Sequence, residues 1–131
     1  MEDVLPLPEG IGDGSAVTVL WRPGCPFCAL LLRRLERTGL VFDRVDIWEH
    51  PAAAAWVRSV ADGNETVPTV RVAGGSPERA VALVNPSPTQ VLDVLARIAP
   101  GAMPGTGGPA SGWRGWLRGR RDRARGRGAR R

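Results

Sequence analysis

The sequence is short of the residues that hold metal ions: it has two cysteines and one histidine among its 131 residues. Zinc in proteins usually takes four ligands, mostly cysteine and histidine. Cys25, Cys28 and His50 would need help from one of the scattered acids, so we expect no bound metal. His50 lies far from Cys25 in the sequence and next to Pro51, and we interpret it as a loop or helix-capping residue.

Long apolar runs are also lacking. The longest, such as Val17 to Trp21, have the length of a strand and fall far short of a membrane-spanning helix. Residues Met1 to Asp13 are acidic and rich in proline and glycine, without the basic and apolar regions of a secretory signal. We therefore expect a cytoplasmic protein. In a reducing compartment, two cysteines spaced Cys-x-x-Cys indicate redox or metal chemistry rather than a structural disulfide.

Lysine is absent, and every strongly basic residue is arginine. Nine of the 18 arginines lie in residues 113–131 beside a single acid, Asp122, which gives this tail a charge near +8. The other nine arginines face twelve acids, so the rest of the chain is near −3. The net charge of +5 therefore belongs to the tail and says little about what the body binds.

Short β-branched stretches alternate with helix-forming stretches between residues 15 and 99, which predicts one folded domain. Gly39 is placed to end the first helix and Pro51 to open the second. The last helix begins at Ser87-Pro88-Thr89-Gln90, a capping box with proline at the first helical position. The predicted strands span 16–20, 41–47, 66–72 and 80–84. The predicted helices span 29–37, 52–60 with Trp56 on the buried side, and a segment from 88 with an apolar stripe at Val91, Leu92, Leu95 and Ile98.

The element order β-α-β-α-β-β-α predicts an α/β protein with a mixed four-stranded sheet and helices on both faces, the thioredoxin-like fold. The first three strands are joined through helices, so we expect them to pair in parallel, and the fourth to turn back after a tight turn at 74–76. Residues 1–14 form an N-terminal extension. The Gly/Pro-rich residues 100–112 predict a flexible linker, and 113–131 a mostly disordered Arg-rich tail.

The chemistry is concentrated in Cys25-Pro26-Phe27-Cys28, between the first strand and the first helix. This position should bring the Cys25 sulfur to the first helical turn, where unpaired N–H groups and the helix dipole favour an anion. The thiolate is the nucleophilic form of cysteine, so we predict Cys25 as the nucleophile. Cys28 follows one helical turn later, within reach of a mixed disulfide on Cys25. Arg22 can add positive potential, and Trp21 borders the loop.

A second element, Val67-Pro68, is expected beside the cysteine loop. Proline alone does not imply a cis bond, but a cis bond here would turn the backbone groups of Val67 outward. Those groups could then pair with the backbone of a bound thiol or peptide, like an added strand.

Over about residues 16–98 the sequence resembles the glutaredoxin family, and within it the mycoredoxins of actinobacteria. The resemblance implies a thioredoxin-like fold, a cis bond before Pro68, Cys25 as nucleophile and Cys28 as resolving or auxiliary thiol. Phe27 stands where tyrosine is common, which removes one hydroxyl near the thiol. The matching segments are Trp21-Arg22-Pro23-Gly24-Cys25-Pro26-Phe27-Cys28, Val45-Asp46-Ile47, Gly63-Asn64-Glu65-Thr66-Val67-Pro68-Thr69-Val70 and Asn85-Pro86-Ser87. The residues expected to bind the thiol or substrate are Trp21, Arg22, Pro26, Phe27, Val67 and Pro68.

The resemblance also implies an activity, the reduction of mixed disulfides between proteins and a low-molecular-weight thiol. Mycothiol, or glutathione in its place, would be the electron-donating co-substrate, with no bound cofactor. In the similar enzymes the nucleophile takes the small thiol onto itself and a second thiol molecule releases it, so Cys28 can be dispensable. A dithiol route through a Cys25–Cys28 disulfide, as in thioredoxins, stays open.

The tail supports a hypothesis of another class. Dense arginine beside Trp113, Trp116 and Leu117 could contact nucleic acid or an anionic membrane surface. The domain would then be a non-enzymatic adaptor for the tail, although the presence of both cysteines argues for redox activity. The plainer alternative is a solubilising extension. For the body we expect a monomer.

Overall fold

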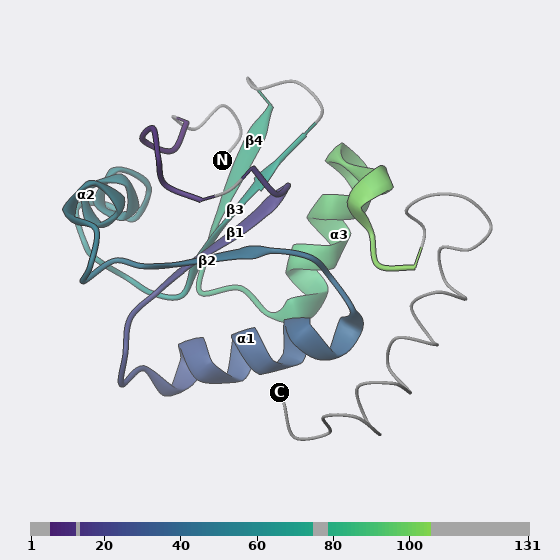
Figure 1. Cartoon of the computed structure of the whole chain (residues 1–131), viewed down its shortest axis with the longest axis horizontal. Coiled ribbons are helices and arrows are strands. Elements are labelled where there is room, and N and C mark those ends of the chain that lie inside the picture. The colour runs from purple at the N-terminus through teal and green to yellow at the C-terminus, as the bar shows by residue number, and fades with distance from the viewer. Residues whose placement is uncertain (1–5, 13, 75–78, 106–131) are drawn as a thin grey trace.

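The structure, a computed structural model, describes residues 6–12, 14–74 and 79–105. Its elements occur in the predicted order, and the thioredoxin-like fold is confirmed (Figure 1). Each predicted element is present, with ends shifted by a few residues. The strands are β1 (Val17–Trp21), β2 (Asp43–Asp46), β3 (Thr69–Ala73) and β4 (Ala80–Val84). The helices are α1 (Pro26–Thr38), α2 (Pro51–Val60) and α3 (Pro88–Ile98), followed by the short 3-10 helix η1 (Pro100–Ala102).

The four strands form one sheet in the order β2-β1-β3-β4. β1 and β2 are parallel, whereas β3 is antiparallel to β1 and β4 to β3. The prediction that the first three strands are all parallel is therefore wrong for β3. Its first residue, Thr69, pairs with Leu20 near the end of β1. β3 therefore starts at the same end of the sheet at which β2 finishes, on the other side of β1, and runs in the opposite direction. Figure 1 shows α2 nearly end-on, while α1 runs along the sheet.

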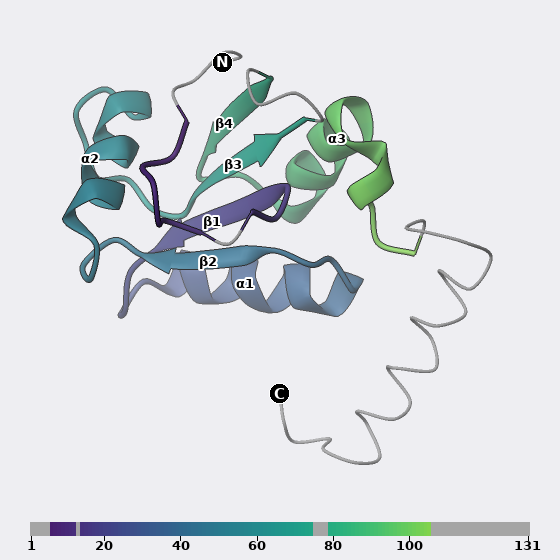
Figure 2. The ribbon, with the colours of Figure 1, turned by 45° about the horizontal axis from the view of Figure 1, so that its top comes forward.

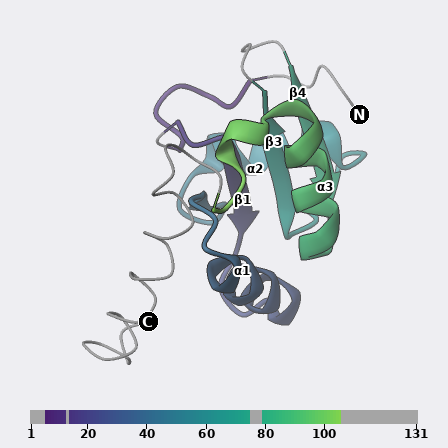
Figure 3. The same cartoon turned by 90° about the vertical axis from the view of Figure 1, so that its right-hand side faces the viewer.

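Hydrophobic residues cover both faces of the sheet. Val17 and Val19 of β1 point to the face covered by α1 and α3, and Leu20 to the face covered by α2. Figure 3 shows α1 nearly end-on and α3 from the side, with α2 behind the strands. The first face buries Leu31, Leu32 and Leu35 of α1 with Val91, Val94 and Leu95 of α3, and the second buries Val45, Ile47, Ala53, Trp56 and Val57. Burial of Trp56 confirms the prediction for that residue.

Local signals set the helix ends as predicted. Gly39 caps α1 in the left-handed conformation, with φ of 85°, and its N–H donates to the Glu36 carbonyl. Ser87 and Gln90 form the reciprocal capping box of α3 at 2.8 and 3.1 Å. The predicted stripe is only partly right: Val94 is buried, whereas Leu92 and Ile98 are half-buried.

Both ends of the domain extend beyond the predicted limits. Ala102 and Met103 pack against the core shared by α1 and α3, so the prediction of a flexible linker from residue 100 is wrong for its first residues. The side chains of Ala102 and Met103 are partly buried against the core, a contact that amino-acid composition alone does not predict. Leu7 and Ile11 pack against the core under α2. The predicted turn at 74–76, beyond Gly74, and the tail at 113–131 lie outside the described residues.

Among the helices of the described segments, none combines the length and apolarity needed to cross a bilayer.

Candidate active site

One end of the sheet collects the loops that carry the predicted site residues. Trp21 pairs with Asp46 where β1 and β2 end. Thr69 pairs with Leu20 and with Val84, so β3 begins and β4 ends at the same place. The loops that follow β1, β2 and β4 and the loop that precedes β3 therefore meet above this end.

Cys25 is the N-cap residue of α1. Its backbone is extended, with φ of −105° and ψ of 107°, and its sulfur accepts a hydrogen bond from the Cys28 backbone N–H at 3.3 Å. The same sulfur lies 3.7 Å from the Val67 carbonyl oxygen, to which the thiol can donate. Pro26 occupies the first helical turn, where its missing N–H leaves no bond unmade. The Cys25 sulfur thus sits at the positive end of the helix, as the sequence predicts.

Cys28 lies one helical turn after Cys25 in α1, and its side chain is buried. Only 1% of it is exposed, against 7% of Cys25, and both thiols are free. Burial is the main reason that the pKa of Cys28 rises from 9.0 to about 12, and a hydrogen bond with Cys25 adds to the rise. A backbone hydrogen bond and the positive charge of Arg22 act in the opposite direction. At neutral pH Cys28 is therefore a buried, protonated thiol.

The Val67-Pro68 peptide bond is cis, as predicted. Pro68 is fully buried, and its carbonyl accepts a hydrogen bond from the Asn85 N–H at 2.8 Å. Asn85, with φ of 52°, belongs to the β4–α3 loop. The cysteine loop, the proline loop and the β4–α3 loop are therefore adjacent in space.

The aromatic residues near the cysteines differ in their surroundings. Phe27 is 64% exposed between the two cysteines, and Pro26 beside it is also exposed. Trp21 is half-buried against the core, and its Nε1 atom is buried without a hydrogen-bond partner among the described residues. Trp48 is 62% exposed. Phe27 therefore offers an apolar surface at the mouth of the site.

Arg22 and Trp48 form a pair that the sequence does not predict. The Arg22 guanidinium lies 5.5 Å from the centroid of the Trp48 ring, within the range of a cation–π interaction. The backbone N–H of Trp48 donates to an Asp46 carboxylate oxygen at 2.8 Å, which fixes the loop after β2. No local sequence pattern links these loops, because the pairing depends on how β1 and β2 end.

No trio of cysteine, histidine or acidic side chains that could hold a metal ion occurs within the described segments.

A cysteine at a helix N-terminus, with a second cysteine one turn inside the helix and a cis-proline loop against the first sulfur, is built for thiol–disulfide exchange. On this sheet topology, these features define a thiol–disulfide oxidoreductase of thioredoxin-like fold.

Comparison with known proteins shows to which family of thiol–disulfide oxidoreductases the chain is similar. The glutaredoxin family profile matches residues 17–76. Rv3198A of Mycobacterium tuberculosis, assigned as a glutaredoxin, is 40% identical over 85 residues, which cover 65% of this chain and 95% of that protein. Mycoredoxin 1 of Corynebacterium glutamicum is 35% identical over 85 residues, 65% of this chain and 99% of that protein. The crystal structure of a wheat glutaredoxin aligns with a TM-score of 0.47 at 18% identity, over 68% of this chain and 83% of that one.

The chain belongs to the glutaredoxin family. It is a thiol–disulfide oxidoreductase, and members of this family work with a low-molecular-weight thiol and protein disulfides rather than with a bound prosthetic group.

Proposed function

We propose that this protein removes a low-molecular-weight thiol, mycothiol, from mixed disulfides with proteins, and that it acts as a cytoplasmic monomer with Cys25 as its nucleophile. The observation that carries the proposal is the Cys25 sulfur, held 3.3 Å from a helix N–H group and 3.7 Å from the Val67 carbonyl. Mycothiol is favoured over glutathione by the similarity to Mycoredoxin 1.

The first step transfers the small thiol. The Cys25 thiolate attacks the mycothiol sulfur of the protein–mycothiol disulfide, which forms a Cys25–mycothiol disulfide and breaks the bond to the substrate. The substrate cysteine leaves as a thiolate and takes a proton from water. The Cys28 N–H bond to the Cys25 sulfur stabilises the negative charge before the attack.

The second step regenerates the enzyme. A second mycothiol, as thiolate, attacks the mycothiol sulfur of the adduct and releases the Cys25 thiolate with oxidised mycothiol. An NADPH-dependent disulfide reductase returns the oxidised thiol to its reduced form. Cys28 has no part in either bond exchange.

The burial of Cys28 favours this monothiol route. A thiol with a pKa of about 12 supplies very little thiolate at neutral pH, and thiolate is needed for attack on a disulfide. Burial, the largest cause of the raised pKa, does not depend on the charge of Cys25. When Cys25 forms its adduct, the contributions of its hydrogen bond and charge are lost, but burial still acts to raise the pKa of Cys28.

The remaining predicted residues are proposed to position the small thiol. The Val67 backbone, held by buried Pro68, offers strand-like pairing to the adduct. Arg22 supplies positive charge, and Trp21 and the exposed Pro26-Phe27 surface supply apolar contacts.

A dithiol route is the second candidate, because the Cys28 backbone contacts the Cys25 sulfur and the two side chains share one helical turn. In that route Cys28 attacks Cys25 in a disulfide with the substrate, forming a Cys25–Cys28 disulfide and releasing the substrate thiol.

Intact-protein mass spectrometry distinguishes the two routes. The Cys28→Ser and Cys25→Ser variants are mixed with a peptide that carries mycothiol in a disulfide. We expect Cys28→Ser to gain the mass of one mycothiol on Cys25 and Cys25→Ser to gain none. A peptide adduct on Cys28→Ser, in place of mycothiol, would contradict the proposal and support the dithiol route.

The Arg-rich residues 113–131 carry a separate proposal that rests on charge alone, an electrostatic contact with nucleic acid or an anionic membrane. The test compares the full chain with a chain ending at Gly105, at low salt, on duplex DNA and on vesicles with anionic lipid. Loss of binding in the shorter chain with unchanged reductase activity would make the tail a localisation device. Equal binding by both chains would refute the contact.

A further inference from the structure

A groove of about 370 Å³ opens beside Cys25, along α1 and toward β2. Cys25, Ala29, Arg33 and Glu36 line it from one side of α1, and Arg44 lines it from β2. β2 is an edge strand of the sheet, and Figure 2 shows α1 running beneath it. The groove therefore starts at the nucleophile and continues along the helix, on the open edge of the molecule.

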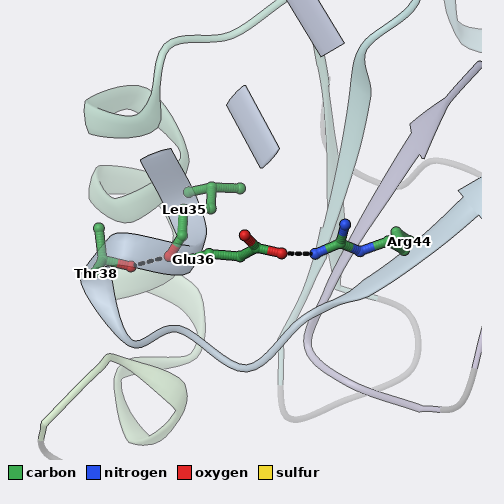
Figure 4. Close-up of polar contacts among 4 residues, drawn as sticks. All are labelled: Leu35, Glu36, Thr38 and Arg44. Atoms are coloured by element: carbon green, nitrogen blue, oxygen red, sulfur yellow. Dashed lines mark hydrogen bonds and ion pairs between the residues drawn. The ribbon is translucent and has the colours of Figure 1, made fainter. Parts of the chain in front are cut away.

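The groove is positively charged. Glu36 forms an ion pair with Arg44, so these two charges cancel (Figure 4). Arg22 and Arg33 also line the groove, and neither forms an ion pair within the described segments. Arg22 instead contacts the Pro23 carbonyl and the Trp48 ring, and both interactions leave its charge uncompensated. Two uncompensated arginine charges thus remain in the groove that begins at the reactive sulfur.

We propose that this groove binds an acidic polypeptide segment next to the modified cysteine of the substrate protein. The inference rests on the proposed function and names the substrate class for the same site. From Cys25 to Glu36 the helix rises roughly 16 Å, the length of about five extended residues. In a segment of that length, carboxylates can contact Arg22 and Arg33 while the mixed disulfide lies against the Cys25 sulfur.

Charge also decides which occupants the groove rejects. The chain's own residues 113–131 carry nine arginines and one acid, so the groove repels them. A basic substrate segment is repelled in the same way. The groove therefore selects among substrates by charge, through attraction that acts mainly on the rate of encounter and weakens with salt.

Adjacent residues of α1 provide a matched pair of variants. Arg33 lines the groove, whereas the neighbouring Arg34, also exposed, does not. Arg33→Glu and Arg34→Glu make the same charge change on the same helix. Glu36→Gln acts in the opposite direction, because it frees Arg44 and adds one positive charge to the groove.

The experiment measures kcat/KM for two peptides with a mycothiol disulfide, one flanked by glutamates and one by lysines. The mixed disulfide of mycothiol with 2-mercaptoethanol serves as an uncharged small substrate. At low salt we expect the wild type to prefer the acidic peptide by roughly tenfold, an advantage that shrinks as salt is added. Arg33→Glu should lose this preference, Arg34→Glu should keep it, and Glu36→Gln should increase it.

Turnover of the small substrate distinguishes a failure of the groove assignment from a failure of the proposed reductase function. Its turnover should be the same in wild type and Arg33→Glu, which also shows that the variant is folded. Equal kcat/KM for both peptides, or equal losses in Arg33→Glu and Arg34→Glu, would overturn the groove assignment and leave the proposed function intact. Failure of the wild type to turn over even the small substrate would overturn the proposed function itself.

Discussion

The backbone N–H of Cys28 lies 3.3 Å from the sulfur of Cys25 and donates a hydrogen bond to it. Cys28 thus supports the nucleophile through its main chain, while its own side chain is 1% exposed. The two cysteines of the motif are therefore chemically unequal. The Cys25 sulfur contacts the Val67 carbonyl, and Cys25 lines the groove. The Cys28 thiol is buried and keeps its proton at neutral pH.

This inequality predicts selective alkylation. At pH 8 a thiol with a pKa of about 12 is almost entirely protonated, with roughly one thiolate in ten thousand molecules. Iodoacetamide should therefore label Cys25 of the reduced protein and leave Cys28 unlabelled until the chain is unfolded in urea. Peptide mass spectrometry locates the label, and labelling of both cysteines at similar rates in the folded protein would refute the prediction.

The same pKa predicts how the stability of the reduced protein depends on pH. Below pH 9 the folded and unfolded chains both hold the Cys28 proton, and its contribution to stability is fully present. Above pH 9 the unfolded chain releases the proton, but the folded chain keeps it up to about pH 12, so stability is lost as pH rises. The loss between pH 9 and 10 should be about 1 kcal/mol.

Urea unfolding at pH 8, 9 and 10 measures this loss. The reduced wild type should lose about 1 kcal/mol more than Cys28→Ala between pH 9 and 10, because the variant lacks the titrating thiol. Parallel pH profiles for the two proteins would show that Cys28 titrates normally in the folded state.

The capping box of α3 predicts a stability effect far from the chemistry. Ser87→Ala removes the acceptor for the Gln90 N–H and should lower the free energy of unfolding by about 1 kcal/mol. Ser59→Ala is the control, because the Ser59 hydroxyl donates to the Trp56 carbonyl within α2 and caps no helix N-terminus. Equal losses in both variants would argue against a specific contribution from the cap.

The packing of η1 predicts where the chain can be shortened. A chain ending at Gly105 keeps the core contacts of Ala102 and Met103, whereas one ending at Ala99 loses them. Since these side chains are only partly buried, the shorter chain should be less stable by about 1 kcal/mol. Thermal unfolding of the two truncated chains tests this, and equal midpoints would place the true domain end at residue 99.

Features set by local chemistry could be predicted from the sequence. Gly39 and the Ser87–Gln90 box act through their own helix ends, and both helix ends were predicted. The placement of Cys25 at a helix N-terminus follows from a strand, a short loop and a proline in succession. The cis bond before Pro68 came from family resemblance, since proline by itself leaves the bond open.

Features set by contacts distant in sequence could not be predicted. The direction of β3 depends on the path of α2 across the sheet, which residue periodicity does not encode. The Arg22–Trp48 pair and the groove at Arg33 need the cysteine loop, α1 and the end of β2 to be placed together. Residues 100–103 have the composition of a linker, yet the Met103 side chain packs against the core and is partly buried.

We expect Cys25 alone to carry the turnover of mycothiol disulfides, and a coupled NADPH assay measures this turnover directly. The assay supplies a mixed disulfide with mycothiol and its reductase, or with glutathione and its reductase, to the wild type, Cys25→Ser and Cys28→Ser. We expect turnover with mycothiol that is lost in Cys25→Ser and kept in Cys28→Ser. Loss of turnover in Cys28→Ser, with wild-type activity supported by thioredoxin reductase instead, would contradict the account and establish a dithiol reductase.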